Sequence, residues 1–493
     1  MTVLQMSAIL STAFMLAVPS TVGQTSSGPS APSIEPTQHI DNVIGCLPAP
    51  VAIKGETSTC PTLLERMAEL KIPGVSIAVI HNGTIEWAQG FGVEKLGGNP
   101  VSSNTLFQAG SISKPVAAMA ALHLVQQNKL SLDGDISKKL TSWKIPASPA
   151  APEAVVTLRE LLTHTAGFTV HGFAGYAAGS PVPTLTEVLN GTKPANSAPI
   201  RLESVPGAKW NYSGGGYTVM QQLLIDVSHQ SFPKLLHDTV LAPIGMNHST
   251  YDQPLPPELQ ASAATPYGAK GEPIPGGAHT YPEMAAAGLW TTPSDLAKYI
   301  IETQLSLQNK ANHVLDRSFT EQMLTPGLGK WGLGVEVGGS ASNPYFTHGG
   351  ANEGFQSLFV GYEHRDEGAV VMTNAVGGLE IANEVMRSVA VEYGWPDFQP
   401  VVRTLAKVDR AALARYVGTY VATPTFSVTY TLDGDQLFAQ ATGQKKFPIF
   451  PESESKFFMK VVDAEIEFHT DNKGEVDYLI LHQGGRDYKE MRK

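Results

Sequence analysis

The sequence predicts an α+β fold, in which one antiparallel sheet is flanked by helices and by a mainly helical subdomain, followed by a small all-β barrel domain. Two observations support this prediction. Strand-like runs occur near residues 74–90 and again at 331–374, on either side of a mainly helical stretch, so we expect one sheet built from both ends. After Pro400 the pattern changes to short alternating runs separated by turns, which is typical of a small barrel or sandwich.

The composition is that of an acidic globular protein. The 493 residues are 42% hydrophobic and 16% charged, with a net charge of −11. A nucleic-acid partner is not expected, because such proteins usually present a basic face. The sequence contains no zinc-type grouping of Cys and His, no phosphate-binding loop and no dinucleotide fingerprint, so we expect no metal or organic cofactor. His164 and His171 have no third ligand nearby and are interpreted as core or loop histidines.

The N-terminal region predicts export. Residues 1–23 contain an apolar run that is too short to span a bilayer, and they are typical of a signal peptide except that the positive charge before the run is missing. Residues 24–61 begin with Ser, Pro, Thr and Gly and are predicted to be a flexible segment. Cys46 and Cys60, the two cysteines, could form a disulfide in an oxidising compartment or be two unrelated buried thiols in the cytosol. We expect a secreted or periplasmic protein with no stable membrane span.

A helix and a hairpin precede the central helix of the chain. Residues 61–70 have helical apolar spacing. The β-rich runs 74–81 and 84–90 flank Asn82-Gly83, which is the strongest short signal for a hairpin. The central helix is then predicted to begin near residue 111.

Ser111 and Lys114 are three residues apart at the start of this helix, so they share one face, with Cβ atoms about 5–6 Å apart. Free N–H groups at a helix N-terminus favour developing negative charge. A serine is a weak nucleophile without a base beside it, and a lysine becomes a base when burial or nearby cations ease the loss of its proton. The pair therefore indicates nucleophilic catalysis, although a helix start with a solvated lysine has the same spacing.

The middle of the chain is predicted to be helical with one long loop. Thr157 and Glu160 have the spacing of a capping box that begins a helix. Residues 168–199 are loop-like and apolar, which favours a lid or a pocket wall. Tyr212 is expected on a sharp turn formed with the glycines that follow it, before a helix at 219–225.

The second half returns to strands. Thr292 and Pro293 are predicted to start a helix as its N-cap and first residue. Strands and a closing helix are then expected at 331–337, 345–350, 354–362, 368–374 and 379–393.

Three short motifs occur in a fixed order: Ser111-Ile112-Ser113-Lys114, Tyr212-Ser213-Gly214 and His348-Gly349-Gly350. In their order and spacing the chain resembles the serine β-lactamase and penicillin-binding-protein superfamily. It is most similar to the class C β-lactamase branch, with its D-aminopeptidase and esterase relatives.

The resemblance covers most of the chain. It implies a β-lactamase/transpeptidase-like hydrolase domain at 62–398, and the segments 161–167 and 286–292 resemble family segments near the site. Residues 405–493 resemble the lipocalin-like β-barrel domains that are appended to many of these hydrolases.

The resemblance also implies a role for each motif residue. Ser111 would accept the acyl group, and Lys114 and Tyr212 would share proton transfer, with either one as the base. The backbone N–H groups of Ser111 and Ala351 would form the oxyanion hole. Substrate-binding residues would be His348, Gly349, Gly350 and Gly214.

Two residues depart from the family pattern. Gly214 stands where β-lactamases and D-Ala-D-Ala peptidases usually carry Asn, and His348 replaces a lysine that would hold a substrate carboxylate. Ester chemistry does not need either group, so we expect an exported serine hydrolase that acts as a carboxylesterase on small or apolar acyl substrates.

Other activities stay open. A D-aminopeptidase, D-Ala carboxypeptidase or weak β-lactamase is the main alternative, with amide or peptide substrates. The same residues would also serve a non-catalytic penicillin-binding or sensing protein. They would equally serve an enzyme that transfers the acyl group to an acceptor other than water. An α/β-hydrolase is disfavoured, since the sequence has no Gly-x-Ser-x-Gly motif. The oligomeric state does not follow from the sequence.

Overall fold

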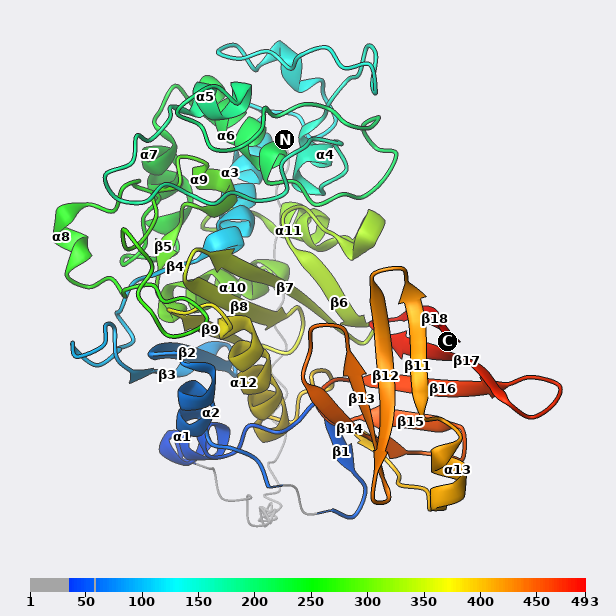
Figure 1. The fold of residues 1–493 in the computed structure, drawn as a ribbon. Helices are drawn as coiled ribbons and strands as arrows, with labels where there is room; N and C mark the ends of the chain where they lie inside the picture. Colours follow the sequence, from blue (N-terminus) through cyan, green and yellow to red (C-terminus); the bar gives the residue numbers. More distant parts are fainter. Residues whose placement is uncertain (1–34, 57–58) are drawn as a thin grey trace, which may run out of the picture. The chain divides into compact units, whose positions relative to one another are not determined.

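A computed structural model of the chain describes residues 35–56 and 59–493 (Figure 1). The predicted signal peptide at 1–23 and the beginning of the segment predicted to be flexible lie outside the described residues.

One six-stranded antiparallel sheet is built from the two ends of the hydrolase region, as predicted. The strand order is β3-β2-β9-β8-β7-β6, so the early hairpin pairs with a strand from the second half of the chain. This arrangement, together with the barrel described below, confirms the predicted α+β fold class. The strands are β2 (Gly74–His81), β3 (Thr84–Gly92), β6 (Glu336–Ser340), β7 (Asn343–Asn352), β8 (Phe355–Tyr362) and β9 (Gly368–Thr373).

Helices cover both faces of this sheet, because alternate side chains of its central strands are apolar on both sides. On β2, Ile77 and Val79 pack in one core with helix α12 (Gly378–Glu392). Ala78 and Ile80, which point to the opposite face, pack in a second core with helix α10 (Pro293–Leu307). The Thr292 cap of α10 forms as the sequence predicts. Helix α2 (Leu63–Leu70), predicted from its apolar spacing, begins at a capping box of Thr62 and Glu65.

The mainly helical region surrounds helix α3 (Ser113–Gln126), whose side chains are buried on every face as far as Leu122. A helix of this kind needs partners all around it. Two short strands, β4 (Phe107–Gln108) and β5 (Trp290–Thr291), pair with each other and join two segments of this region. Its other helices are α4 (Leu158–Leu162), α5 (Leu185–Asn190), α6 (Gly214–Ser228), α7 (Phe232–Leu236), α8 (Pro257–Gln260), α9 (Met284–Ala287) and α11 (Arg317–Leu324).

The segment predicted to be flexible at 24–61 differs from that prediction over much of its described length. Residues 36–45 form helix α1 (Pro36–Gly45), whose Val43 is buried in the core beside α12. The Ser388 hydroxyl donates a hydrogen bond to the Val43 carbonyl oxygen at 2.7 Å. Cys46 and Cys60 form one disulfide. The polar composition of the first residues does not extend to α1, which has an apolar face.

Two further elements differ from expectation. The loop predicted at 168–199 contains helix α5, which begins at a Thr184–Glu187 capping box. Helix α6 begins at Gly214 rather than at 219, with Ser213 as its N-cap. The three glycines therefore lie in its first turn, and Gly215 contacts the Thr169 carbonyl so closely that a Cβ there would lie 2.3 Å from the oxygen.

The C-terminal region forms a closed eight-stranded antiparallel barrel. Of the two folds that the sequence allows for this region, a barrel or a sandwich, the barrel is the one observed. A linker with β10 (Val401–Arg403), which pairs with β1 (Val51–Ile53), and α13 (Arg410–Ala414) precedes it. The barrel strands are β11 (Gly418–Thr423), β12 (Phe426–Asp433), β13 (Gln436–Ala441), β14 (Lys446–Pro451), β15 (Lys456–Met459), β16 (Ala464–Thr470), β17 (Val476–Gln483) and β18 (Arg486–Arg492).

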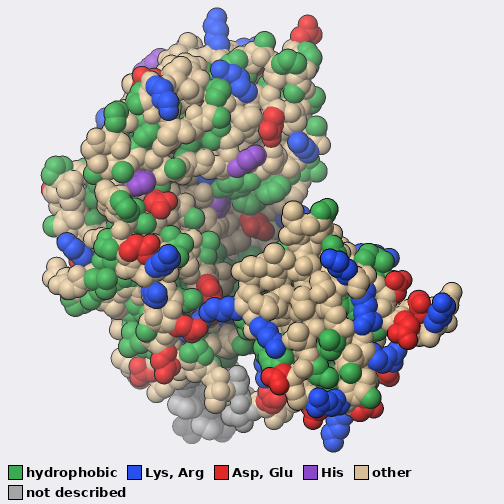
Figure 2. All heavy atoms as spheres, in the orientation of Figure 1, with side chains coloured by type: hydrophobic (Ala, Val, Ile, Leu, Met, Phe, Trp, Pro, Cys, Tyr) green, Lys and Arg blue, Asp and Glu red, His purple; other side chains and the backbone are tan. Residues whose placement is uncertain are grey.

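The surface carries mixed charges. Figure 2 shows acidic and basic side chains interspersed over the face drawn, without one large basic area. Among the described residues, no helix is both long and apolar enough to cross a membrane.

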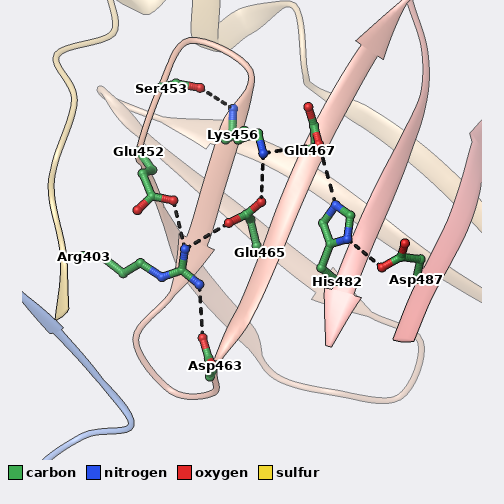
Figure 3. Close-up of polar contacts among 9 residues, drawn as sticks. All are labelled: Arg403, Glu452, Ser453, Lys456, Asp463, Glu465, Glu467, His482 and Asp487. Carbon is green, nitrogen blue, oxygen red and sulfur yellow. Dashed lines mark hydrogen bonds and ion pairs between the residues drawn. The ribbon is translucent and has the colours of Figure 1, made fainter. Parts of the chain in front are cut away.

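An ion-pair network ties the linker to the outside of the barrel (Figure 3). Arg403 pairs with Glu465 at 2.9 Å, Glu452 at 3.0 Å and Asp463 at 3.2 Å. In the described part of the chain, Glu465, Glu467 and His482 are the one group close enough to share a cation. The Lys456 ammonium already lies 3.2 Å from the Glu465 carboxylate and 3.5 Å from that of Glu467, so a protein cation already pairs with both carboxylates of the group.

Candidate active site

Ser111 and Lys114 meet at the start of the central helix. Ser111 lies in a short 3-10 helix (Gly110–Ile112) that leads directly into α3. The Lys114 Nζ atom is 3.0 Å from Ser111 Oγ and donates a second hydrogen bond to the Ala286 carbonyl oxygen at 2.8 Å. Burial lowers the pKa of Lys114 to about 7, because the charged form loses its hydration. A large fraction of this lysine is therefore neutral at neutral pH.

Tyr212 completes the group. Its ring centroid is 4.9 Å from Lys114 Nζ. Burial raises the pKa of Tyr212 to about 12, and the nearby Ser111 side chain opposes part of that increase. The structure thus brings the three predicted catalytic side chains together, with the lysine pKa shifted toward neutrality and the tyrosine pKa shifted away from it.

Two histidines fix the backbone of Tyr212. The Nδ1 atom of His164 accepts a hydrogen bond from the Ser213 N–H at 3.1 Å, and the ring of His164 lies against the Tyr212 ring, with centroids 4.2 Å apart. His171 donates from Nδ1 to the Tyr212 carbonyl oxygen.

The sequence predicts both histidines as core or loop residues, and His164 is indeed buried. Both, however, form hydrogen bonds with the backbone of the turn that carries Tyr212. The available signal was the resemblance of residues 161–167 to family segments near the site.

His348 also lies near Tyr212 and is neutral. It is 4% exposed, and its ring centroid is 6.3 Å from that of Tyr212 and 5.4 Å from that of Trp331. Its Nδ1 atom carries a proton, since it donates to the Gly349 carbonyl oxygen at 2.6 Å. Burial lowers the pKa of His348 to about 3, and the charge of Lys114 acts in the same direction. This residue therefore supplies no fixed positive charge for a substrate carboxylate.

Two glycines bring strand β7 into contact with the turn that carries Ser111. A Cβ on Gly350 would lie 1.9 Å from the Ala109 carbonyl oxygen, and a Cβ on Gly110 would lie 2.5 Å from the Ala351 nitrogen. Real Cβ atoms do not approach so closely, so only glycine fits at both positions. The contact places the Ala351 N–H beside the Ser111 turn, as an oxyanion hole requires.

Aromatic rings form walls near Tyr212. The Phe173 ring packs against Gly214, where a Cβ would lie 3.0 Å from the ring. Trp331 lies 5.8 Å from Tyr212 and 5.7 Å from Trp210 between ring centroids. Phe173 comes from the apolar stretch 168–199, and its packing here agrees with a pocket wall. The position at which the sequence resemblance leads us to expect Asn in β-lactamases is thus a glycine covered by an aromatic ring.

Comparison with known proteins identifies the family. Residues 62–391 match the model of the beta-lactamase family. The chain belongs to the beta-lactamase family. Residues 403–492 match a second family model, which is described as a domain of unknown function (DUF3471). The beta-lactamase family is one of serine hydrolases of the β-lactamase and penicillin-binding-protein type.

Individual relatives are distant. Penicillin-binding protein 4* of Bacillus subtilis is 21% identical over 473 residues, which cover 87% of this chain and 97% of that protein. Protein flp of Staphylococcus aureus strain N315 is 25% identical over 323 residues, which cover 62% of this chain and 60% of that protein.

Solved structures share the beta-lactamase fold. The octameric penicillin-binding protein homologue from Pyrococcus abyssi has a TM-score of 0.60 at 22% identity, covering 87% of this chain and 98% of that one. D-alanine carboxypeptidase AmpC from Burkholderia cenocepacia has a TM-score of 0.54 at 20% identity, covering 71% of this chain and 99% of that one. At these identities the likeness concerns the fold.

Proposed function

We propose that this chain is an exported carboxylesterase that hydrolyses esters of small or apolar acyl groups through an acyl-enzyme on Ser111. The observation that carries the catalytic part is the 3.0 Å approach of Lys114 Nζ to Ser111 Oγ in a buried site. A buried lysine that is partly neutral near pH 7 can accept the serine proton.

The proposed reaction has two stages. Lys114 accepts the Ser111 proton as Oγ attacks the ester carbonyl carbon, and the N–H groups of Ser111 and Ala351 stabilise the tetrahedral oxyanion. The alcohol leaves with a proton delivered through Tyr212 and Lys114, and the acyl group stays on Ser111. A water molecule then attacks the acyl-enzyme and gives one proton to the same pair, the bond between Ser111 Oγ and the acyl carbon breaks, and the pair returns that proton to Oγ as the carboxylic acid leaves. Lys114 is the base in this scheme because the pKa of Tyr212 lies far above neutrality.

The substrate preference rests on what lines the site. His348 is neutral and offers no positive charge to a substrate carboxylate, and Lys114, in contact with Ser111, is engaged in catalysis. The rings of Phe173 and Trp331 favour an apolar acyl group or alcohol instead.

A peptidase or weak β-lactamase activity is the second candidate. Its support is the similarity to Penicillin-binding protein 4* over nearly its whole length and the fold shared with a D-alanine carboxypeptidase. A penicillin-binding protein that is acylated without turnover, or an acyl transferase, would use the same Ser111 and is distinguished by its products.

Hydrolysis of p-nitrophenyl butyrate by the wild type and by Ser111→Ala, measured side by side, tests the proposal. We expect turnover in the wild type and loss to no more than a few per cent in the variant. Retained activity in Ser111→Ala would overturn the assignment of the nucleophile. A wild type that turns over D-alanyl peptides or β-lactams but not the ester would favour the second candidate, and a single stoichiometric acylation would favour a binding protein.

A further inference from the structure

The C-terminal barrel is hollow at one end. A cavity of about 640 Å³ opens there, within the size range of sites for small molecules. An eight-stranded barrel is just wide enough to be filled by its own side chains or to hold one small ligand. The wall consists mainly of apolar side chains from the barrel strands, including Phe426, Val428, Ala439, Phe447, Ile466 and Leu481.

A buried carboxyl group lies in the barrel interior, one inward-facing residue pair beyond the cavity wall. Strands β17 and β18 are paired, and Leu481, which lines the cavity, lies opposite Tyr488. Two residues further along each strand, with side chains on the same face, Leu479 lies opposite Glu490. Leu479 belongs to the barrel core, so Glu490 points inside as well. Glu490 is 1% exposed, and its Oε2 atom has no hydrogen-bond partner among the described residues.

This carboxyl is not explained by the barrel itself. A buried polar group without a partner is costly, and most such groups in proteins are paired. Burial raises the pKa of Glu490 to about 7. Tyr430 lines the cavity, and burial and then the charge of Glu490 raise its pKa. The barrel interior therefore holds a phenol on the cavity wall and, further inward, an unpaired carboxyl.

The charges around the cavity restrict what it can hold. Two cationic side chains border it at its mouth, Arg66 and Lys445. Arg66 is already paired with Glu384 at 2.7 Å and Glu380 at 2.8 Å, and Lys445 is exposed to solvent. A fatty-acid anion inserted head first would meet the Glu490 carboxyl, whereas an alcohol or amine could donate to it.

We propose that the barrel binds one small apolar molecule that carries a single hydrogen-bond donor, an alcohol or an amine, with the apolar part against the cavity wall and the donor on Glu490. This site is separate from Ser111 and does not depend on the proposed esterase activity.

Calorimetric titration of the full chain with 1-decanol, decylamine and decanoate tests this proposal. We expect the alcohol or the amine to bind with a dissociation constant below about 100 µM and decanoate to bind at least about tenfold more weakly. Tight binding of the amine with weak binding of the alcohol would assign the natural ligand to amines, and the reverse would assign it to alcohols. Failure of both, or a preference for decanoate, would overturn the proposal.

Variants locate the binding. Ala439→Trp fills the cavity and is expected to weaken binding at least about tenfold, whereas Gln440→Trp, one residue along the same strand and exposed on the outside, is the matched control. Ala441→Phe, nearer the mouth, replaces Ala439→Trp if thermal unfolding shows that the latter does not fold.

Glu490→Leu removes the acceptor and is expected to weaken binding of the alcohol or amine by about tenfold. Unchanged binding in the cavity variants would place the ligand elsewhere and overturn the proposal, and unchanged binding in Glu490→Leu would overturn the role of the carboxyl.

Discussion

The imidazole of His164 lies against the phenol of Tyr212, with ring centroids 4.2 Å apart, and its Nδ1 atom accepts a hydrogen bond from the N–H of the following residue, Ser213. His164 adopts a left-handed backbone conformation, with φ of 58°, which is uncommon for a residue with a side chain. Such conformations persist where the surroundings over-determine them, often near active sites. His164 is therefore a positioning residue for Tyr212.

The first prediction concerns this contact. His164→Ala is expected to lower kcat on p-nitrophenyl butyrate by about tenfold or more with a small change in KM, because the loss of a buried hydrogen bond and of ring packing lets Tyr212 move. His164→Asn is the conservative variant, since Asn tolerates the left-handed conformation and its Oδ1 can accept from Ser213. Partial rescue by Asn supports positioning, and equal kcat in the wild type and the Ala variant would contradict it.

The second prediction concerns the contact between Gly350 and Ala109. In Gly350→Ala the new Cβ would overlap the Ala109 carbonyl oxygen, so strand β7 must move away from the Ser111 turn. Because the Ala351 N–H moves with the strand, we expect kcat to fall by about 10²–10³, the usual cost of losing one oxyanion donor.

Gly349→Ala is the matched comparison for this change. A Cβ at Gly349 would have its nearest neighbour at 3.9 Å, so the strand can stay in place and a much smaller loss of kcat is expected. Similar losses in the two variants would contradict the steric explanation, and circular dichroism checks that both fold.

The third prediction concerns the disulfide between Cys46 and Cys60, which are 14 residues apart in sequence. A crosslink that closes a loop of this length is expected to stabilise the folded state by about 3 kcal/mol, mainly by restricting the unfolded chain. The variant with both cysteines changed to Ser should lose about that free energy of unfolding in urea. Addition of dithiothreitol should destabilise the wild type to a similar extent and leave the variant unchanged, and equal stability of wild type and variant would contradict the prediction.

Local patterns predicted most of the elements. The Asn82-Gly83 hairpin and the Thr157–Glu160 capping box depend on residues that are neighbours in sequence, and both form as expected. The sheet assembled from both ends also followed from the order of strands and helices. Helix α5 was missed, although the same kind of capping box precedes it, because the apolar loop around it obscured a helix of only two turns.

The sequence predicted those residues of the site that belong to the three short motifs. Ser111 and Lys114 belong to one helix turn, so their spacing alone places them together. His164 reaches Tyr212 only through the tertiary fold, 48 residues along the chain. The neutral state of His348 and the contact of Gly350 with Ala109 likewise depend on packing between distant segments, which no sequence spacing reveals.

The last prediction concerns the charge of Lys114. If this lysine is the base, its neutral form is active, so kcat/KM for the ester should rise about tenfold per pH unit below pH 7 and level off above it, as the pKa of about 7 requires. The pKa of Tyr212, about 12, lies too high to bend this profile in the accessible range. Lys114→Arg should abolish turnover at every pH, since a guanidinium does not give up its proton.

The same pKa has a consequence for stability that does not involve turnover. A lysine in the unfolded chain has a pKa near 10.4, so between about pH 7 and pH 10 the unfolded state binds more protons than the folded state. The stability of the wild type relative to Lys114→Met should therefore increase with pH across this window and be constant below it. Urea unfolding of both proteins at pH 6, 8 and 9.5 measures the difference. A difference that does not change between these pH values would show that Lys114 keeps its proton when buried, and the base would then have to be Tyr212.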